Sequence, residues 1–272
     1  MKTSAWWFGV CAIVATANVW ATYADEVLAD NPVAYYRFEE STGTTAADST
    51  ANANNGTYVN GALLNQASAT NLGRAVLLDG VSAYIDTPNT VGGNFSLEMW
   101  LKSTAPSLSG SQAYEGNGLL WSDVGGSAND FVLAQLNNHA AFFTGNPDTT
   151  TEGSTVLNDG SWHHVVATRA LGGATQLFVD GQLQASGTSN GNLLTDNNRI
   201  AIGGNVLDGR YFSGLVDEVA YYPSVLSAAR IQAHYLAGIP AQPVPALDAR
   251  MMLLLMGAIS LLGLGCWRRA LS

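Results

Sequence analysis

Short apolar runs, separated by clusters of Gly, Asn, Asp and Ser, constrain the fold of this chain more than any other feature. Runs of this length with turn residues between them are typical of β-strands. We expect strands at 34–38, 75–78, 95–102, 118–121, 131–136, 140–143, 162–168, 176–179, 199–202 and 212–221. So many short strands, with one helix-like segment at the end, predict an all-β sandwich of two antiparallel sheets.

The run 95–102 shows how these strands should be buried. Phe95, Leu97, Met99 and Leu101 alternate with polar residues and therefore fall on one face of a strand. That face is predicted to be core. Trp100 points to the opposite face, which indicates that the second surface of this sheet is also covered.

Two local signals mark the ends of elements. Asp180-Gly181 between two apolar runs is typical of a type I′ hairpin turn. Ser227 is a suitable N-cap for a short amphipathic helix that ends at Gly238, ahead of a proline-rich linker. We expect this helix to close the domain.

A series of sequence blocks resembles the laminin-G-like, concanavalin A-like jelly rolls of bacterial surface proteins. The blocks are Tyr35-Tyr36-Arg37-Phe38, Ala47-Asp48-Ser49, Leu78-Asp79-Gly80, Phe95-Ser96-Leu97-Glu98-Met99-Trp100, Trp162-His163-His164-Val165, Leu177-Phe178-Val179-Asp180-Gly181, Ile202-Gly203-Gly204 and Gly214-Leu215-Val216-Asp217-Glu218-Val219. The resemblance covers nearly all of 34–238 and implies a jelly-roll sandwich. It is specific for fold and weak for function, because such jelly rolls include lectins, adhesion modules and a few enzymes.

The N-terminus reads as a signal peptide. Lys2 precedes the apolar stretch 5–15, and small residues at Thr22 and Ala24, or at Val19 and Ala21, offer a cleavage site. We expect a signal peptide at 1–24, a mature chain that begins near Asp25 and a folded domain at 25–238. The protein is therefore expected to be exported.

The C-terminus combines a linker and sorting motif at 239–250 with an apolar helix and basic end at 251–269. The apolar run of 17 residues would rise about 25 Å, slightly less than a hydrocarbon core of about 30 Å. The tail resembles PEP-CTERM and IPTL-CTERM sorting tails, which implies a membrane protease of the exosortase type as a partner. It lacks Pro-Glu-Pro, and a plain single-pass anchor is the alternative. Either reading predicts at least transient membrane anchorage at the cell surface.

Cysteine and charge exclude several classes of protein. Cys11 lies in the expected signal and Cys266 in the tail, so the domain between them should fold without disulfides. Between Asp25 and Pro243 there are 7 Lys and Arg against 20 Asp and Glu, a net charge of −13. Such a domain repels phosphate backbones, so nucleic acid is not an expected partner.

Catalytic signatures are absent from the sequence. Retaining glycanases of related jelly rolls present paired carboxylates as Glu-x-Asp-x-x-Glu along one strand, and this chain has no such triplet. Glu98 stands alone, and neighbouring Asp217 and Glu218 should point to opposite faces. His163 and His164 have no nucleophile beside them and are expected to hydrogen-bond neighbouring groups. We therefore predict no enzymatic activity.

The jelly-roll resemblance implies a structural Ca²⁺ that ties the N-terminal segment to the last long strand. Oxygen ligands in loops are the requirement, and Asp217, Asp48 and Glu39 are the candidates by position. In the alternative reading, Asp48 caps a turn and Asp217 pairs with an arginine.

A sugar-binding surface needs aromatic rings beside polar loops, where a ring stacks on pyranose C–H groups. Tyr114, Phe143 and Tyr211 lie next to such loops and are the candidate ligand-binding residues. We expect a non-catalytic cell-surface module that recognises carbohydrate or an extracellular-matrix component. A structural or adhesive protein-binding module is the second reading, and a divergent glycoside hydrolase the third.

Overall fold

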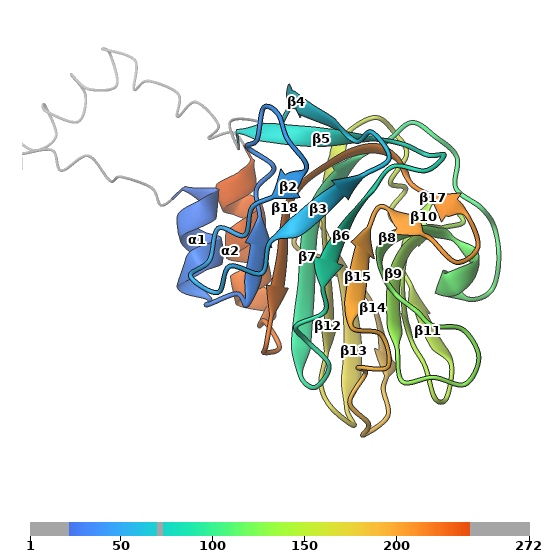
Figure 1. The fold of residues 1–272 in the computed structure, drawn as a ribbon. Helices are drawn as coiled ribbons and strands as arrows, with labels where there is room; N and C mark the ends of the chain where they lie inside the picture. The colour runs from blue at the N-terminus through green and yellow to red at the C-terminus, as the bar shows by residue number, and fades with distance from the viewer. Residues whose placement is uncertain (1–21, 70–72, 240–272) are drawn as a thin grey trace, which may run out of the picture. The chain divides into compact units, whose positions relative to one another are not determined.

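Two antiparallel β-sheets face each other in the computed structural model, which describes residues 22–69 and 73–239 (Figure 1). Sheet I has the strand order β14 (Gln182–Thr188), β13 (Ala174–Val179), β12 (Trp162–Arg169), β7 (Phe95–Lys102), β18 (Ser213–Tyr222), β5 (Arg74–Asp79) and β4 (Leu63–Ala67), with β1 (Ala34–Tyr36) also paired to β18. The expected two-sheet antiparallel sandwich is confirmed. The expected membrane segment at 251–269 and residues 1–21 of the signal peptide lie outside the described residues.

Sheet II forms the other layer. Its order is β11 (Thr149–Glu152), β10 (His139–Thr144), β9 (Phe131–Leu136), β8 (Asn117–Ser122), β15 (Arg199–Ile202), β6 (Tyr84–Pro88), β3 (Gly56–Val59) and β2 (Thr45–Ala46), while the short strands β16 (Gly204–Asn205) and β17 (Arg210–Tyr211) lie beside β8. A 3-10 turn, η1 (Ala113–Glu115), precedes β8. Because β15 pairs with both β8 and β6, residues far apart in sequence meet on one surface.

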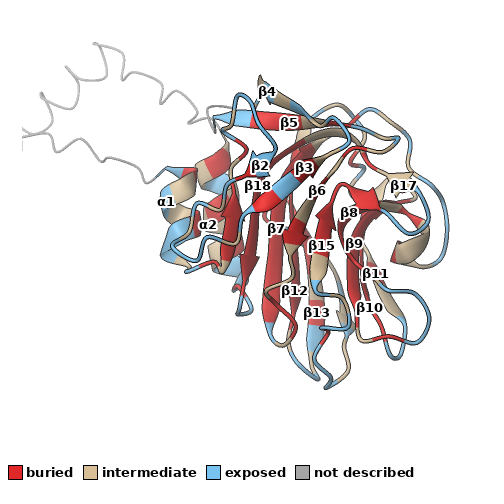
Figure 2. Ribbon diagram, in the orientation of Figure 1, coloured by how far each residue is buried: buried red, intermediate tan, exposed pale blue. Residues whose placement is uncertain are grey.

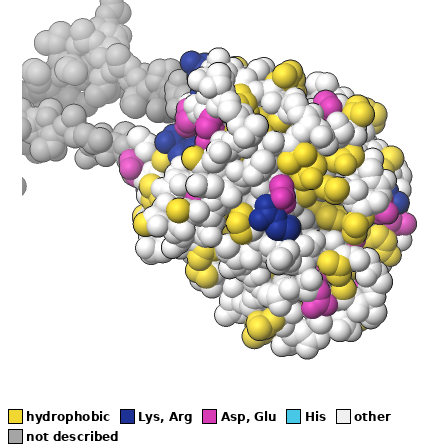
Figure 3. All heavy atoms as spheres, in the orientation of Figure 1, with side chains coloured by type: hydrophobic (Ala, Val, Ile, Leu, Met, Phe, Trp, Pro, Cys, Tyr) yellow, Lys and Arg dark blue, Asp and Glu magenta, His cyan; other side chains and the backbone are white. Residues whose placement is uncertain are grey.

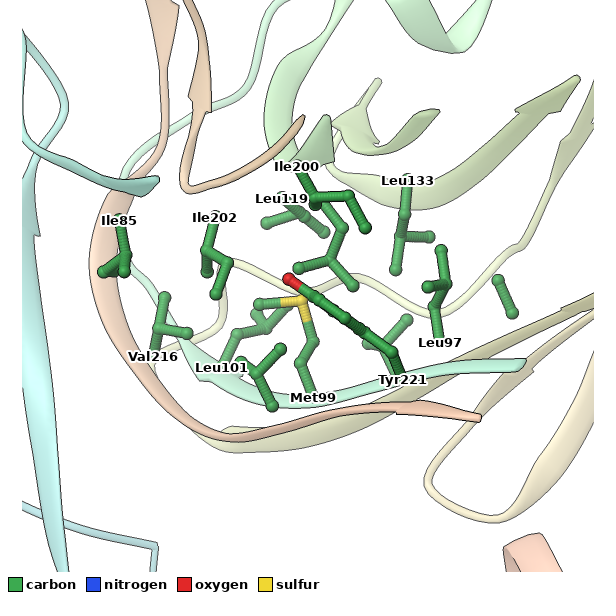
Figure 4. Packing of buried hydrophobic residues seen from close by; sticks show 14 of the residues in the cluster. Ile85, Leu97, Met99, Leu101, Leu119, Leu133, Ile200, Ile202, Val216 and Tyr221 are labelled. Atoms are coloured by element: carbon green, nitrogen blue, oxygen red, sulfur yellow. The ribbon is translucent and has the colours of Figure 1, made fainter. Parts of the chain in front are cut away.

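The main core lies between the sheets and follows the alternation of each strand. In β7, Phe95, Leu97, Met99 and Leu101 are fully buried against sheet II, as predicted. Figure 4 shows Leu97, Met99 and Leu101 of sheet I packed with residues of sheet II such as Leu119, Leu133 and Ile200. Burial of this apolar surface is the main stabilising contribution to the sandwich.

The outer face of sheet I carries a second apolar cluster, centred on Trp100. Two helices cover it, α1 (Tyr23–Ala29) and α2 (Ala228–Gly238), which lie side by side (Figure 1). Figure 2 shows that the strands beneath these helices are largely buried. The prediction that Trp100 lies under a cover is therefore confirmed.

Local signals at two turns are also confirmed. Asp180 and Gly181 have φ values of 52° and 73°, the two positive values that a type I′ turn requires. The Ser227 side chain caps α2 by accepting a hydrogen bond from the Arg230 amide, and the helix ends at Gly238. Helix α1 was not predicted from the sequence, because seven residues are too few for a clear helical period.

A buried polar network links the helices to sheet I. The Glu98 carboxylate accepts hydrogen bonds from the hydroxyls of Tyr23 and Tyr222 at 2.7 and 2.5 Å, and contacts His164 Nε2 at 2.7 Å and His234 Nδ1 at 3.0 Å. His234 Nε2 in turn lies 2.9 Å from Asp30. These groups come from α1, β7, β12, β18 and α2.

Candidate functional site

A groove on the outer face of sheet II is the most developed candidate site. It consists of two hollows of about 330 and 560 Å³ that share Asp123. The first is lined by Tyr84, Asp86, Trp121, Asp123, Val124, Asn197, Arg199, Ala201, Val206 and Leu207, and the second by Tyr114, Asp123, Gly125, Gly126, Ser127, Phe143, Pro147, Asp148 and Asp208. In Figure 3, hydrophobic side chains gather on this face next to a basic and an acidic side chain in contact.

The strand pattern of sheet II explains why these side chains face outward. In β6, Ile85 and Thr87 point into the sandwich, so Tyr84 and Asp86 point out. The neighbouring strands β15 and β8 add Ala201 and Trp121 to the same surface. Three strands that are separated in sequence thus build the floor of the first hollow.

Aromatic rings lie along both hollows. Tyr114 and Phe143, two of the predicted ligand-binding residues, line the second hollow and pack edge to face with ring centroids 5.2 Å apart. The third, Tyr211, does not line either hollow. Its ring packs against that of Tyr84 in the first hollow, with ring centroids 6.3 Å apart. The structure therefore brings all three predicted residues to one face of the sandwich.

Carboxylates give the groove a negative character. Asp86 pairs with Arg199 at 2.6 Å and Asp208 with Arg210 at 3.3 Å. Asp123 and Asp148 form no ion pair with any residue that the structure describes. The arginines therefore neutralise only part of the acidic lining.

Asp130 lies buried beside this acidic lining. Burial, a hydrogen bond with Asp123, and repulsion from Asp123 and Asp148 raise the pKa of Asp130 to about 7. Its carboxylate also accepts a hydrogen bond from the Val124 amide at 3.2 Å. Asp130 therefore keeps its proton to a higher pH than an ordinary aspartate, next to a loop that forms the wall of the groove.

Sequence reasoning missed several groove residues, including Tyr84, Trp121 and Asp123. Trp121 sits in an expected strand, and its outward position followed from alternation only once the core face was known. Asp123 follows the same strand and precedes Gly125-Gly126, a loop signal that could have marked it. Nothing local indicated that the two would meet Tyr84.

The three predicted calcium ligands do not share one position. Asp48 accepts hydrogen bonds from the amides of Tyr35, Thr50 and Asn54, so it caps a turn with its oxygens occupied by donors. Asp217 is buried, and Ser68 donates a hydrogen bond to it at 2.5 Å. Burial, with repulsion from Glu218 and Glu39, holds the pKa of Asp217 well above its usual range.

A protein site for a metal ion needs several ligating side chains grouped around one point. No group of three or more His, Cys, Asp or Glu side chains with such geometry occurs within 22–69 and 73–239. Among the described residues, Asp217 and Glu39 therefore belong to no carboxylate cluster that could hold a cation by itself, and Asp48 does not fit.

The adjacent histidines have the structural partners that the sequence analysis expected. His163 contacts Asp180 at 2.8 Å and Asp159 at 3.2 Å. His164 contacts Glu98, and both of these side chains are fully buried. Because no substrate can reach Glu98 or His164 from solvent, this pair of residues serves the packing of α1 and α2.

The fold and the groove together define a lectin-like jelly-roll sandwich. Residues 79–232 match the family model Laminin_G_3, the concanavalin A-like lectin/glucanases superfamily. The chain belongs to this family, which confirms the resemblance seen in the sequence blocks. None of the curated proteins compared with the chain matches its sequence.

Solved structures share this fold at low sequence identity. Domain 4 of AbnA, a GH43 extracellular arabinanase from Geobacillus stearothermophilus in complex with arabinotriose, matches with a TM-score of 0.57 and 20% identity, over 75% of this chain and 98% of that one. The binding domain of Paraclostridial Mosquitocidal Protein 1 matches with a TM-score of 0.59 and 12% identity over 76% of this chain, and that of Botulinum Neurotoxin DC in complex with SialylT with 0.58 and 11% over 77%. The chain spans 52% of each toxin domain.

Neither α1 nor α2, which fall within 22–69 and 73–239, has the length and apolar character of a membrane-spanning helix.

Proposed function

We propose that this protein is an exported, non-catalytic module that binds a carbohydrate chain in the groove of sheet II. The observation that carries the proposal is a continuous pair of hollows in which Tyr84, Tyr114 and Phe143 lie beside carboxylates and loop backbone. Rings that stack on sugar C–H groups, with polar groups for the hydroxyls, are what a glycan site requires. Two proteins of the same fold are described in complex with arabinotriose and with SialylT, which supports the proposal.

The charge of the groove favours a neutral glycan. Asp123 and Asp148 face the second hollow without a cationic partner among the described residues, whereas Arg199 and Arg210 are already paired. A sialic acid or uronate would meet this negative field in addition to that of an acidic domain. Neutral hydroxyls can instead donate hydrogen bonds to the two carboxylates.

Binding without cleavage is part of the proposal. Asp130, the carboxylate whose pKa suits a general acid, is buried and does not line either hollow. Asp123 and Asp148 both line the second hollow, so release of reducing ends from a bound glycan is the observation that would favour a glycoside hydrolase.

Aromatic substitutions test the groove directly. We expect Tyr84→Ala and Tyr114→Ala each to weaken glycan affinity roughly tenfold, since an aromatic contact at a binding site is worth about 1.4 kcal/mol or more. Tyr235→Ala is the matched control, because Tyr235 stacks on Trp100 at the opposite face of the domain. The full chain would be screened against neutral glycans and their sialylated or uronate-bearing counterparts, and affinities measured by titration calorimetry.

The outcomes of this screen separate the alternatives. Loss of binding in both groove variants, with neutral glycans preferred, supports the proposal. Equal glycan affinity of Tyr84→Ala, Tyr114→Ala and wild type would contradict the placement of the glycan in the groove. A preference for acidic glycans would contradict the prediction that the ligand is neutral.

A protein-binding or adhesive role is the second candidate. Val124, Val206 and Leu207 line the first hollow and expose 42%, 42% and 63% of their surface. Exposed apolar side chains that gather in this way are typical of protein contacts. No detectable binding to any glycan, together with binding to matrix proteins, would favour a protein-binding or adhesive role.

Calcium remains a proposal for the region around Asp217 and Glu39. A cation bound by these carboxylates would offset the burial and the neighbouring negative charge that raise the pKa of Asp217. We expect 1 mM Ca²⁺ to raise the melting temperature of the wild type by several degrees relative to chelator, roughly as a ligand at 100 times its dissociation constant would. The shift should vanish in Asp217→Asn and persist in Asp148→Asn. Identical melting of the wild type with calcium and with chelator would contradict the proposal.

The described chain begins and ends on the face of the domain opposite the groove. Thr22 and Ile239 lie at α1 and α2, on the outer face of sheet I, whereas the groove lies on the outer face of sheet II. We propose that the tail beyond Ile239 tethers the protein at the cell surface, at least until an exosortase-type protease acts on it. Attachment at this face would leave the groove free to bind.

A further inference from the structure

Two cleavage sites for the expected signal peptide are equivalent in sequence. Signal peptidases require small residues at the first and third positions before the cut, and both Val19 with Ala21 and Thr22 with Ala24 satisfy this rule. The first site leaves Thr22 at the new N-terminus, and the second leaves Asp25. The contacts of residues 22–24 distinguish the two products.

Tyr23 is a core residue of the folded domain. Its side chain is 2% exposed, and its hydroxyl donates a hydrogen bond to Glu98 at 2.7 Å. Its ring packs edge to face on Trp100 with centroids 6.1 Å apart. A Cβ at Gly238 would lie only 3.2 Å from Tyr23, so α2 is also fitted closely against it. A chain that begins at Asp25 would lack this ring and leave Glu98 without one of its donors.

Thr22 has an equally specific place as the N-cap of α1. Its hydroxyl accepts a hydrogen bond from the Asp25 amide at 3.2 Å, while its own amide donates to Asp25 Oδ2 at 2.9 Å. This reciprocal arrangement is a capping box, and α1 is only seven residues long. Loss of residues 22–24 would remove both the cap and the first turn of the helix that covers sheet I.

We infer that the mature protein begins at Thr22, through cleavage between Ala21 and Thr22. Water adds to the Ala21 carbonyl and the peptide bond breaks, which leaves a carboxylate on Ala21 and an ammonium group on Thr22. That ammonium forms where the Thr22 nitrogen already meets the Asp25 carboxylate, so processing completes an ion pair in the capping box. Both the core and the cap are kept in this product.

The first test is the N-terminus of the exported protein. The full chain would be expressed with its own leader in a Gram-negative host, and the N-terminal peptide of the exported fraction identified by mass spectrometry. Ala21→Leu and Ala24→Leu form a matched pair, because each places a large residue directly before one candidate cut. We expect the wild type and Ala24→Leu to begin at Thr22, and Ala21→Leu to lose this product. A wild-type chain that begins at Asp25, begins elsewhere or remains uncut overturns the inference.

A second measurement tests whether the fold depends on the Tyr23 side chain. Tyr23→Ala in the full chain should lower the melting temperature by roughly 10 °C, the scale expected when a buried aromatic ring is removed from a domain of this size. Tyr23→Phe keeps the ring and loses only the hydrogen bond to Glu98, so it should cause a smaller decrease. Equal melting of Tyr23→Ala and wild type would show that the fold does not need this residue, and would overturn the argument for the Thr22 terminus.

Discussion

Arg169→Met is expected to lower the free energy of unfolding by about 3–5 kcal/mol, as removal of a buried charged group that satisfies many partners does. The Arg169 side chain is fully buried and forms no ion pair with any carboxylate of the described residues. All its N–H groups are used: Nε donates to Ser189 Oγ, Nη1 to the carbonyls of Gly92 and Gly93, and Nη2 to those of Asn190 and Asn192. The variant would remove the donor from all these acceptors, of which the Gly92 carbonyl belongs to a buried residue.

Urea unfolding with a fitted midpoint and slope would measure the effect of this substitution. Arg169→Lys should recover less than half of the loss, because an ammonium group has three donors and lacks the planar geometry of guanidinium. Arg74→Met, at an exposed position of β5, is the control and should change stability by about 0.5 kcal/mol or less. Similar midpoints for Arg169→Met and Arg74→Met would refute the role of Arg169.

The hydrogen bonds of Arg169 also connect it to the groove. Asn190, held by Arg169, donates its side-chain amide to the Gly145 carbonyl at 2.7 Å. Gly145 lies just before Pro147 and Asp148, which line the second hollow. We therefore expect Arg169→Met to weaken ligand binding as well as folding.

Glu98→Gln is the second substitution with a large expected effect, about 3–5 kcal/mol of lost stability. Burial opposes ionisation of Glu98, but His234 and His164 outweigh it and hold the pKa of Glu98 well below its usual range. Burial likewise disfavours the charged form of His234, yet Glu98 and Asp30 outweigh it and raise the pKa of His234. The neutral amide removes the charge on which both effects depend.

The pH dependence of stability distinguishes this network from a simple packing defect. The lowered pKa of Glu98 stabilises the fold above about pH 4.3, and this contribution is lost as pH falls through the folded-state value. The raised pKa of His234 stabilises the fold below about pH 6.5, and this contribution is lost as pH rises through its folded-state value. The contributions of Glu98 and His234 are therefore both present between about pH 4.3 and pH 6.5.

Melting curves across pH would test this assignment. In Glu98→Gln the decline above about pH 6.5 should be much weaker, because His234 has lost its principal anion. Glu152→Gln is a matched control, since Glu152 pairs with His139 at 3.2 Å in a half-exposed position and should contribute about 1 kcal/mol or less. A wild-type profile with no decline above pH 6.5 would contradict the proposed charge state of His234.

The sequence determined the local structure well, and for a physical reason. In β7 every second side chain is apolar, and only one face of a pleated strand can turn toward a given core, so the burial of Leu97 and Met99 followed directly. Asp180-Gly181 fixed a hairpin because its positive φ values are favourable for few other residue pairs. The order of the family blocks then fixed the sandwich.

Only the tertiary structure decided which residues meet. Strand β15 lies between β8 and β6, and this order brings Trp121, Tyr84 and Arg199 to one groove although 115 positions separate the outermost two of them in the chain. Glu98 looked solitary in sequence, whereas its partners come from four other elements. Likewise, two leader cleavage sites were equivalent until the buried ring of Tyr23 distinguished them. Alternation and turn residues act over a few neighbours, while strand order depends on burying both sheets at once, which no local pattern encodes.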